Sequence, residues 1–210
     1  MAEATHPAAR YPDVDPISVR DPVAEVLGVL DPGEPFEIGY PDVVRAAGHS
    51  CPTAAGAYRI AELGLAALYP DDLPVRGEVA VRVGGPRDET AYGVTGRLLS
   101  FVTGAAGEDG FGGLPGGFGK RRGLLEYGPI DGTGVRVRLS RPEVRDAVVV
   151  TYDVGALPGL GDAKRHLPAV VEGTATPDEA LAFREAWHRR VDAVLSSDEF
   201  FTVEASDAPG

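Results

Sequence analysis

Cysteine is scarce in this sequence: Cys51 is the single one among 210 residues. One thiol excludes a disulfide within the chain, and it excludes a zinc cage built from several cysteines of one chain. No apolar run approaches the roughly 18 residues of a membrane-spanning helix, and the N-terminus lacks the charged-then-apolar pattern of a signal peptide. These absences predict a cytoplasmic protein that does not enter a membrane.

Positive charge is also limited, since 20 Lys and Arg stand against 32 Asp and Glu, which gives a formal net charge of −12. Such acidity argues against binding to the phosphate backbone of a nucleic acid and against docking on an anionic membrane. A local basic patch, Lys-Arg-Arg, occurs at 120–122. The apolar fraction of 43% is ordinary for a globular protein, and the length suits one large domain with a full core.

Residues 48–59 form the stretch around which the rest of the chain is organised, Gly-His-Ser-Cys-Pro-Thr-Ala-Ala-Gly-Ala-Tyr-Arg. Cys51 falls at the N-cap and Pro52 at the first position of a helix predicted over 52–68. The positive end of that helix favours the thiolate of Cys51, and His49 can add an imidazole nitrogen to the same site. A purely structural role would explain the same residues: Cys51 would be a small buried side chain, and His49 a loop residue held by hydrogen bonds.

Hydrophobic periodicity predicts the other elements. They are strands at 77–83, 123–127, 134–139, 144–152 and 200–203, and helices at 91–102 and 177–195. This order predicts an α+β fold with a mixed sheet, whose core is helix, strand, helix and three strands, followed by a C-terminal helix. Residues 1–16 are predicted to be a flexible arm, 17–205 a single domain and 206–210 a polar tail.

A glycine-rich stretch follows the second core helix, with eight glycines among the sixteen residues at 104–119. This composition predicts a flexible loop that serves as a lid or an interface. Phe111 and Phe118 lie within this stretch, and their side chains are candidates for contact with a ligand or a partner. The pattern of a phosphate-binding loop is absent, because Lys120 is followed by Arg121 and not by Ser or Thr.

The central stretch resembles the FmdE-like family, which includes one of the subunits of formylmethanofuran dehydrogenase. The residues that carry the resemblance are Gly48, His49, Cys51, Pro52 and Gly-Ala-Tyr-Arg at 56–59, and more loosely Thr103-Gly104, Gly119-Lys120 and Glu126-Tyr127-Gly128. The resemblance spans roughly 40–152, and the family's core order agrees with the elements predicted above. It implies a homodimer and a metal site, often zinc, built around His49 and Cys51.

This sequence departs from the family pattern at one important position, because the second family cysteine falls on Ala105. A third zinc ligand would therefore come from Glu89, Asp109, Tyr127 or a partner chain. On this hypothesis the chain is a metal-dependent enzyme acting on a small-molecule substrate. Lys120 or Tyr127 would lie near that substrate, and a metal-bound water would be the nucleophile.

Three alternatives fit the same residues. In the first the chain binds haem, with Cys51 or His49 as the axial ligand and Phe111 and Phe118 against the flat cofactor. In the second it is a metal-free thiol enzyme in which His49 activates Cys51. In the third it is a non-catalytic accessory subunit of an oxidoreductase, docked through its acidic surface and glycine-rich loop. His188 lies on a polar helical face and is predicted to be a surface histidine.

Overall fold

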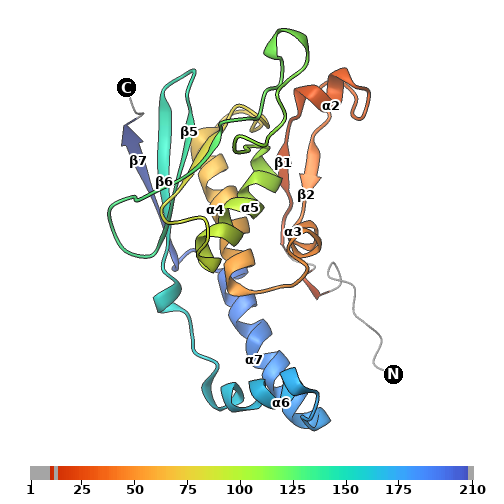
Figure 1. Cartoon of the computed structure of the whole chain (residues 1–210), viewed down its shortest axis with the longest axis vertical. Coiled ribbons are helices and arrows are strands. Elements are labelled where there is room, and N and C mark those ends of the chain that lie inside the picture. Colours follow the sequence, from red (N-terminus) through yellow and green to blue (C-terminus); the bar gives the residue numbers. More distant parts are fainter. Residues whose placement is uncertain (1–9, 12–13, 208–210) are drawn as a thin grey trace.

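A mixed five-stranded sheet forms the centre of the protein in the computed structural model, which describes residues 10, 11 and 14–207 (Figure 1). The strand order is β4-β3-β5-β6-β7. The strands are β3 (Ala80–Val83), β4 (Leu125–Tyr127), β5 (Val135–Arg141), β6 (Asp146–Tyr152) and β7 (Phe201–Asp207). β3 and β4 run parallel, while the other neighbours run antiparallel. The prediction of an α+β fold with a mixed sheet is therefore confirmed.

Two helices cover one face of this sheet, α4 (Pro52–Leu68) and α5 (Thr90–Thr103) (Figure 1). Glycines on α4 allow it to lie close to the strands. A Cβ atom at Gly64 would stand 2.7 Å from Leu139 Cδ1, a contact that no side chain could make without displacing the leucine. Leu139, on β5, is fully buried at this contact. The helix begins as predicted, because Cys51 is its N-cap and Pro52 its first residue.

The N-terminal part forms a second, smaller layer of β1 (Ile17–Val19), α2 (Pro22–Val26), β2 (Phe36–Ile38) and α3 (Tyr40–Ala47). β1 and β2 pair antiparallel. Tyr11 is only 6% exposed, and its ring packs edge-on against Tyr40 with the centroids 4.9 Å apart. This residue therefore belongs to the core, although it falls in the segment predicted to be a flexible arm; residues 1–9, 12 and 13 of that segment lie outside the described residues.

The chain returns to the sheet through a C-terminal helical segment. It consists of the short 3₁₀ turns η2 (Val154–Ala156) and η3 (Gly161–His166), then α6 (Leu167–Glu172) and α7 (Pro177–Ser196). α7 starts at a capping box formed by Thr176 and Glu179, as its sequence predicts. β7 then pairs with β6 as far as Asp207. The strand is thus longer than the predicted 200–203 and takes up residues that were expected to form a polar tail.

The glycine-rich loop follows a defined path, including the 3₁₀ turn η1 (Pro115–Gly117). Its backbone closes on itself, since the Leu114 amide donates to the Phe118 carbonyl at 2.8 Å and the Arg121 amide to the Phe111 carbonyl at 2.9 Å. The loop also packs on α2, where a Cβ atom at Gly119 would stand 2.0 Å from Val23 Cγ2. Contacts within the chain therefore shape this loop, which the sequence predicts to be flexible.

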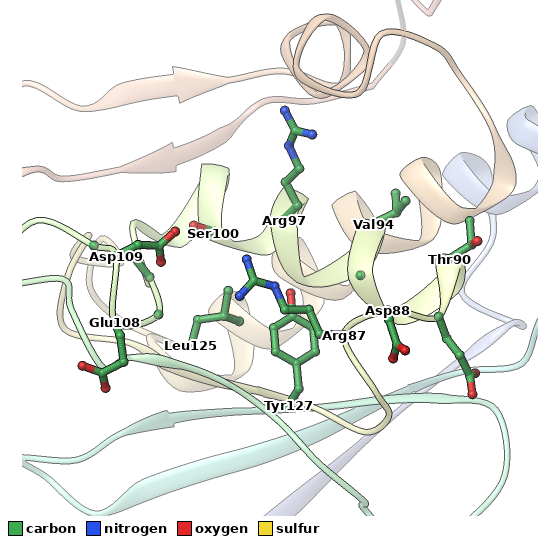
Figure 2. A pocket seen from close by; sticks show the side chains of 15 residues that line it. Arg87, Asp88, Thr90, Val94, Arg97, Ser100, Glu108, Asp109, Leu125 and Tyr127 are labelled. Atoms are coloured by element: carbon green, nitrogen blue, oxygen red, sulfur yellow. The ribbon is translucent and has the colours of Figure 1, made fainter.

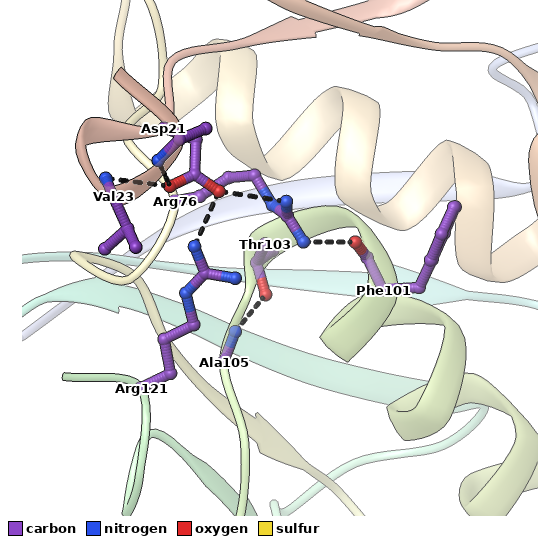
Figure 3. A network of polar contacts seen from close by, with 8 residues as sticks. Asp21, Val23, Arg76, Phe101, Thr103, Ala105 and Arg121 are labelled. Carbon is purple, nitrogen blue, oxygen red and sulfur yellow. Dashed lines mark hydrogen bonds and ion pairs between the residues drawn. The ribbon is translucent and has the colours of Figure 1, made fainter. Parts of the chain in front are cut away.

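A buried carboxylate, that of Asp21, joins three segments of the chain, and Arg76 extends the network to a fourth (Figure 3). One carboxylate oxygen accepts from Arg76 Nη1 at 3.0 Å and Arg121 Nη2 at 2.6 Å, and the other caps α2 by accepting from the Val23 amide. Arg76 also donates to the Phe101 carbonyl near the end of α5. Arg121, from the basic patch of the sequence, is thus part of the structural framework. Among the described residues, no helix is both long enough and apolar enough to cross a membrane.

Candidate functional site

A cleft of about 1090 Å³ opens along α5 (Figure 2). Its walls are α5 itself, the turn at 86–89 that precedes the helix, the loop at 106–110 that follows it, and strand β4. We refer to it as the α5 cleft. The backbone of the 106–110 loop is held beside β4, because the amides of Leu124 and Leu125 both donate to the carbonyl of Ala106.

The residues of α5 that face the cleft recur at helical spacing: Thr90, Gly93, Val94, Arg97 and Ser100. Two glycines of the helix shape its surroundings. A Cβ atom at Gly93 would stand 2.4 Å from the Arg87 carbonyl oxygen, so the missing side chain lets the preceding turn close on the helix. A Cβ atom at Gly96 would stand 2.3 Å from the Tyr127 hydroxyl, so the tyrosine ring can lie flush against α5.

Charged side chains of both signs line the α5 cleft. The cations are Arg87 and Arg97, and the carboxylates are Asp88, Glu89, Glu108 and Asp109. Within the part of the chain that the structure describes, none of the six forms an ion pair or a side-chain hydrogen bond. Their charges are therefore available to a bound molecule.

Tyr127 brings a phenol to the same cleft from β4. Burial of the ring raises the pKa of Tyr127 above its ordinary value, and the nearby guanidinium of Arg87 opposes this rise in part. The phenol therefore keeps its proton at neutral pH. Its hydroxyl has no hydrogen-bond partner among the described residues, so it can donate a hydrogen bond to a ligand.

The structure brings together some of the residues predicted from the sequence and separates others. Glu89, Asp109 and Tyr127, the candidates for a third metal ligand, all line the α5 cleft. Lys120, Phe111 and Phe118 do not line it; Phe111 and Phe118 belong to the glycine-rich loop, which packs on α2 at Gly119, and Lys120 follows directly after that loop. His49 and Cys51 lie elsewhere again, at the start of α4 and close to α7. The predicted site residues thus occupy three places.

The His-Ser-Cys turn at 49–51 has a geometry of its own. His49 is exposed, and its Nδ1 lies 3.2 Å from the Ala47 carbonyl oxygen. Cys51 is 8% exposed, and its Sγ accepts a hydrogen bond from the Ala54 amide at 3.3 Å. Over the described residues, no group of three or more His, Cys, Asp or Glu side chains is arranged to hold a metal ion. A closed zinc site is therefore not formed from these residues of one chain.

Ser50 lies at the centre of a hydrogen-bond network that the sequence did not reveal. Its Oγ lies 2.7 Å from the Tyr11 hydroxyl and 2.9 Å from the Tyr40 hydroxyl, and the Tyr11 hydroxyl lies 3.0 Å from His188 Nδ1. Trp187 Nε1 donates to the Ser50 carbonyl at 2.9 Å. Two consecutive residues of α7 therefore hold Ser50 in place: Trp187 directly, and His188 through Tyr11.

His188 is half-buried, and its imidazole takes part in this network. The sequence predicts an exposed surface histidine at this position. Burial lowers the pKa of His188, the guanidinium of Arg10 adds to that effect, and the carboxylate of Asp192 opposes it. The neutral imidazole is therefore favoured, and its Nδ1 can accept the Tyr11 hydroxyl proton in a hydrogen bond. No local pattern in the sequence would have indicated this contact, because 177 residues separate the partners.

No protein-family model matches the sequence, and a comparison with curated proteins finds no match. The resemblance to the FmdE-like family therefore stays a prediction that rests on the residues at 48–59 and on the looser second motif.

Proposed function

We propose that this protein binds a small anionic molecule in the α5 cleft and acts on it, with Tyr127 as hydrogen-bond donor or general acid. The observation that supports this proposal best is the guanidinium of Arg87, which lies across Tyr127 in the cleft (Figure 2) and has no ion-pair partner among the described residues. An arginine fork matches a carboxylate or phosphate group geometrically, and its hydrogen bonds to anions are among the stronger ones in proteins.

The fold adds to this preference for an anion. The first residue of α5, Thr90, faces the cleft. Backbone amides at a helix start carry partial positive charge and have no partner within the helix. The phenol of Tyr127 supplies a neutral donor whose proton is retained at neutral pH. Together these groups would orient an anionic ligand and could protonate it in a reaction.

This proposal predicts a loss of binding in arginine variants. We expect inorganic phosphate or hexanoate to shift the backbone amide resonances of α5 and β4 in a nuclear magnetic resonance titration. Arg87→Ala should weaken that binding by about tenfold or more, since it removes a charge-assisted hydrogen bond. Arg184→Ala, an exposed arginine on α7, is the matched control and should bind as the unmodified protein does. Unchanged resonances with both anions would overturn the proposal.

A second candidate function is metal binding at His49 and Cys51, and one contact favours it. If His49 Nδ1 donates its proton to the Ala47 carbonyl, Nε2 carries the lone pair and can bind a metal ion. Metal-binding histidines commonly hold their other nitrogen in this way. Zinc would polarise a substrate or a water there. His49 and Cys51 would supply two ligands, and the others would come from a partner, as in the homodimer that the family resemblance implies.

Zinc titration tests this second candidate. Replacing a residue that only hydrogen-bonds to a metal ligand typically weakens metal binding by about 10- to 100-fold. His49 and Cys51 would bind zinc directly, so we expect His49→Ala and Cys51→Ser each to weaken zinc binding by more than about 100-fold. Competition with a chromophoric chelator measures the affinity, and sedimentation shows whether zinc changes the oligomeric state. His166→Ala, which removes a histidine beside Glu179, is the control. Equal affinities in all three variants would exclude this site.

The haem alternative has less support from the geometry, and the accessory-subunit alternative stays a prediction. Phe111 and Phe118 belong to the glycine-rich loop, which packs on α2 at Gly119, whereas Cys51 is the N-cap of α4 and follows Ser50, which contacts α7. A haem bound axially by Cys51 or His49 would thus find different neighbours from those predicted. An absorption spectrum after haem addition tests the first alternative, and co-purification of a large partner tests the second.

A further inference from the structure

A second pocket, of about 520 Å³, lies between α7 and the segment that leads from β6 into η3 (Figure 1). One wall is the segment 158–163, and the other is formed by residues of α7, namely Ala182, Glu185, Ala186, Arg189 and Arg190. We refer to it as the α7 pocket. Ala182, Ala186 and Arg190 follow one another at intervals of four residues, so they share one face of the helix. The small side chains of the two alanines leave space beside the arginine.

The guanidinium of Arg190 has no partner that would explain its position. Arg190 is half-buried, and its Nε is closed off from water without a hydrogen bond. Among the described residues it forms neither an ion pair nor a side-chain hydrogen bond. Every other half-buried arginine of the described chain interacts with another group; these are Arg59, Arg76, Arg121, Arg136, Arg138 and Arg141.

A charge that is partly removed from water is unfavourable unless it is paired. The described chain supplies no carboxylate to Arg190, and the guanidinium lines a pocket large enough for a small molecule. An anionic group in the α7 pocket would therefore provide the interactions that the protein itself does not. A guanidinium presents a planar fork of N–H donors, which matches the two oxygens of a carboxylate.

We propose that the α7 pocket binds a monocarboxylic acid with a hydrocarbon part, and that its carboxylate meets Arg190. The hydrocarbon part would contact the apolar side chains of the pocket, which are those of Pro158, Leu160, Ala163, Ala182 and Ala186. The α7 pocket shares no lining residue with the α5 cleft, so this site is separate from the function proposed above.

The remaining charges of the pocket favour a single negative charge on the ligand. Asp162, Glu185 and Arg189 also line it, and all three are exposed, so water and salt screen their effects. Arg190 is half-buried, and its attraction for an anion is screened less. Because it is the one half-buried cation of the pocket, it can neutralise a carboxylate but not a phosphate dianion. The two exposed carboxylates add repulsion against a second negative charge.

Octanoate, octanamide and acetate are suitable probes of the α7 pocket. In a nuclear magnetic resonance titration we expect octanoate to shift the backbone amide resonances of residues 158–163 and 182–190. Octanoate should bind at least about tenfold more tightly than octanamide, which lacks the charge. It should exceed acetate, which lacks the hydrocarbon part, by a similar factor.

Substitutions show whether Arg190 is the partner of the carboxylate. Arg190→Met keeps an unbranched apolar side chain without the guanidinium, so it should weaken octanoate binding by about tenfold or more. The unliganded variant should unfold at a temperature no lower than that of the unmodified protein, because the lost charge has no partner in the described structure. Arg184→Ala, an exposed arginine of α7 outside the pocket, is the matched control and should bind octanoate normally. Arg87→Ala should also do so, which distinguishes this site from the α5 cleft.

Several results would overturn the proposal. Equal affinities for octanoate and octanamide would show that the pocket does not recognise a charge, and octanoate binding unchanged by Arg190→Met would show that Arg190 is not the partner. Acetate or inorganic phosphate bound as tightly as octanoate would contradict the ligand class. If no probe shifts residues 158–163 or 182–190, the α7 pocket is not a binding site. A lower unfolding temperature for Arg190→Met would mean that the guanidinium has a structural role instead.

Discussion

Replacing Asp21 with alanine is expected to lower the free energy of unfolding by about 3 kcal/mol. The change leaves two guanidinium groups, those of Arg76 and Arg121, partly buried without the carboxylate that neutralises them. Removing one partner of a buried ion pair typically costs about 3–5 kcal/mol. The lower end applies here because the arginine side chains keep 17% and 20% of their exposure. Denaturation by guanidinium chloride, followed by circular dichroism, measures the effect.

Two further variants identify the cause of this loss. Asp21→Asn keeps the side-chain shape and one acceptor oxygen but removes the charge, so it should lose less stability than the alanine variant. Asp71→Ala removes an exposed carboxylate and should change the free energy of unfolding by less than about 0.5 kcal/mol. An Asp21→Ala protein as stable as Asp71→Ala would show that the network of Figure 3 contributes nothing to stability.

A side chain at Gly56 is expected to have an effect of similar size. A Cβ atom there would stand 2.3 Å from Cε1 of Tyr152, whose ring is buried between α4 and Phe201. Overpacking of a filled core costs about 1–3 kcal/mol, and the branched side chain of valine places Gly56→Val at the upper end of that range. The same denaturant titration measures the loss.

The control for Gly56 lies on the same helix. Ala66 is exposed, so Ala66→Val should cost only the difference in helix propensity, which is below about 1 kcal/mol. Truncating the ring in the double variant Gly56→Val/Tyr152→Ala should make the valine less costly than it is beside the intact tyrosine, because the two residues are in contact. If valine costs the same with and without the tyrosine ring, the close approach of α4 to Tyr152 is wrong.

Gly56 also shows that part of the FmdE-like motif has a structural explanation. The Tyr58 hydroxyl donates to the Asp15 carbonyl at 2.6 Å, which joins α4 to the N-terminal layer. Arg59 forms ion pairs with Glu62 and Asp198. Gly56, Tyr58 and Arg59 thus hold the fold together, and their match to the motif carries no information about a metal. A test of the predicted family resemblance should therefore concentrate on His49 and Cys51.

Elements with local signals could be predicted from the sequence. The start of α4 is predictable because an N-cap followed by proline is encoded within a few residues, and the capping box of α7 is equally local. The length of β7 could not be predicted, because it depends on pairing with β6, which lies on the far side of the C-terminal helical segment in the sequence. Strand ends of this kind are decided by the partner strand and not by local composition.

The candidate site was only partly predictable, for the same reason. Tyr127, Glu89 and Asp109 were singled out one by one, but nothing in the sequence showed that they share a cleft. Arg87 and Arg97 were missed altogether. A usable signal existed for Arg97, since Thr90, Gly93, Arg97 and Ser100 place small or polar residues along one face of a helix whose other residues are largely apolar.

The contacts of Ser50 with α7 have a consequence for the order of events during synthesis on the ribosome. The Trp187 indole that holds the Ser50 carbonyl is translated 137 residues later. Until then the turn at 49–51 lacks the hydrogen bond from α7 that holds its backbone. Maturation of this turn is therefore a late step, and it coincides with the docking of α7.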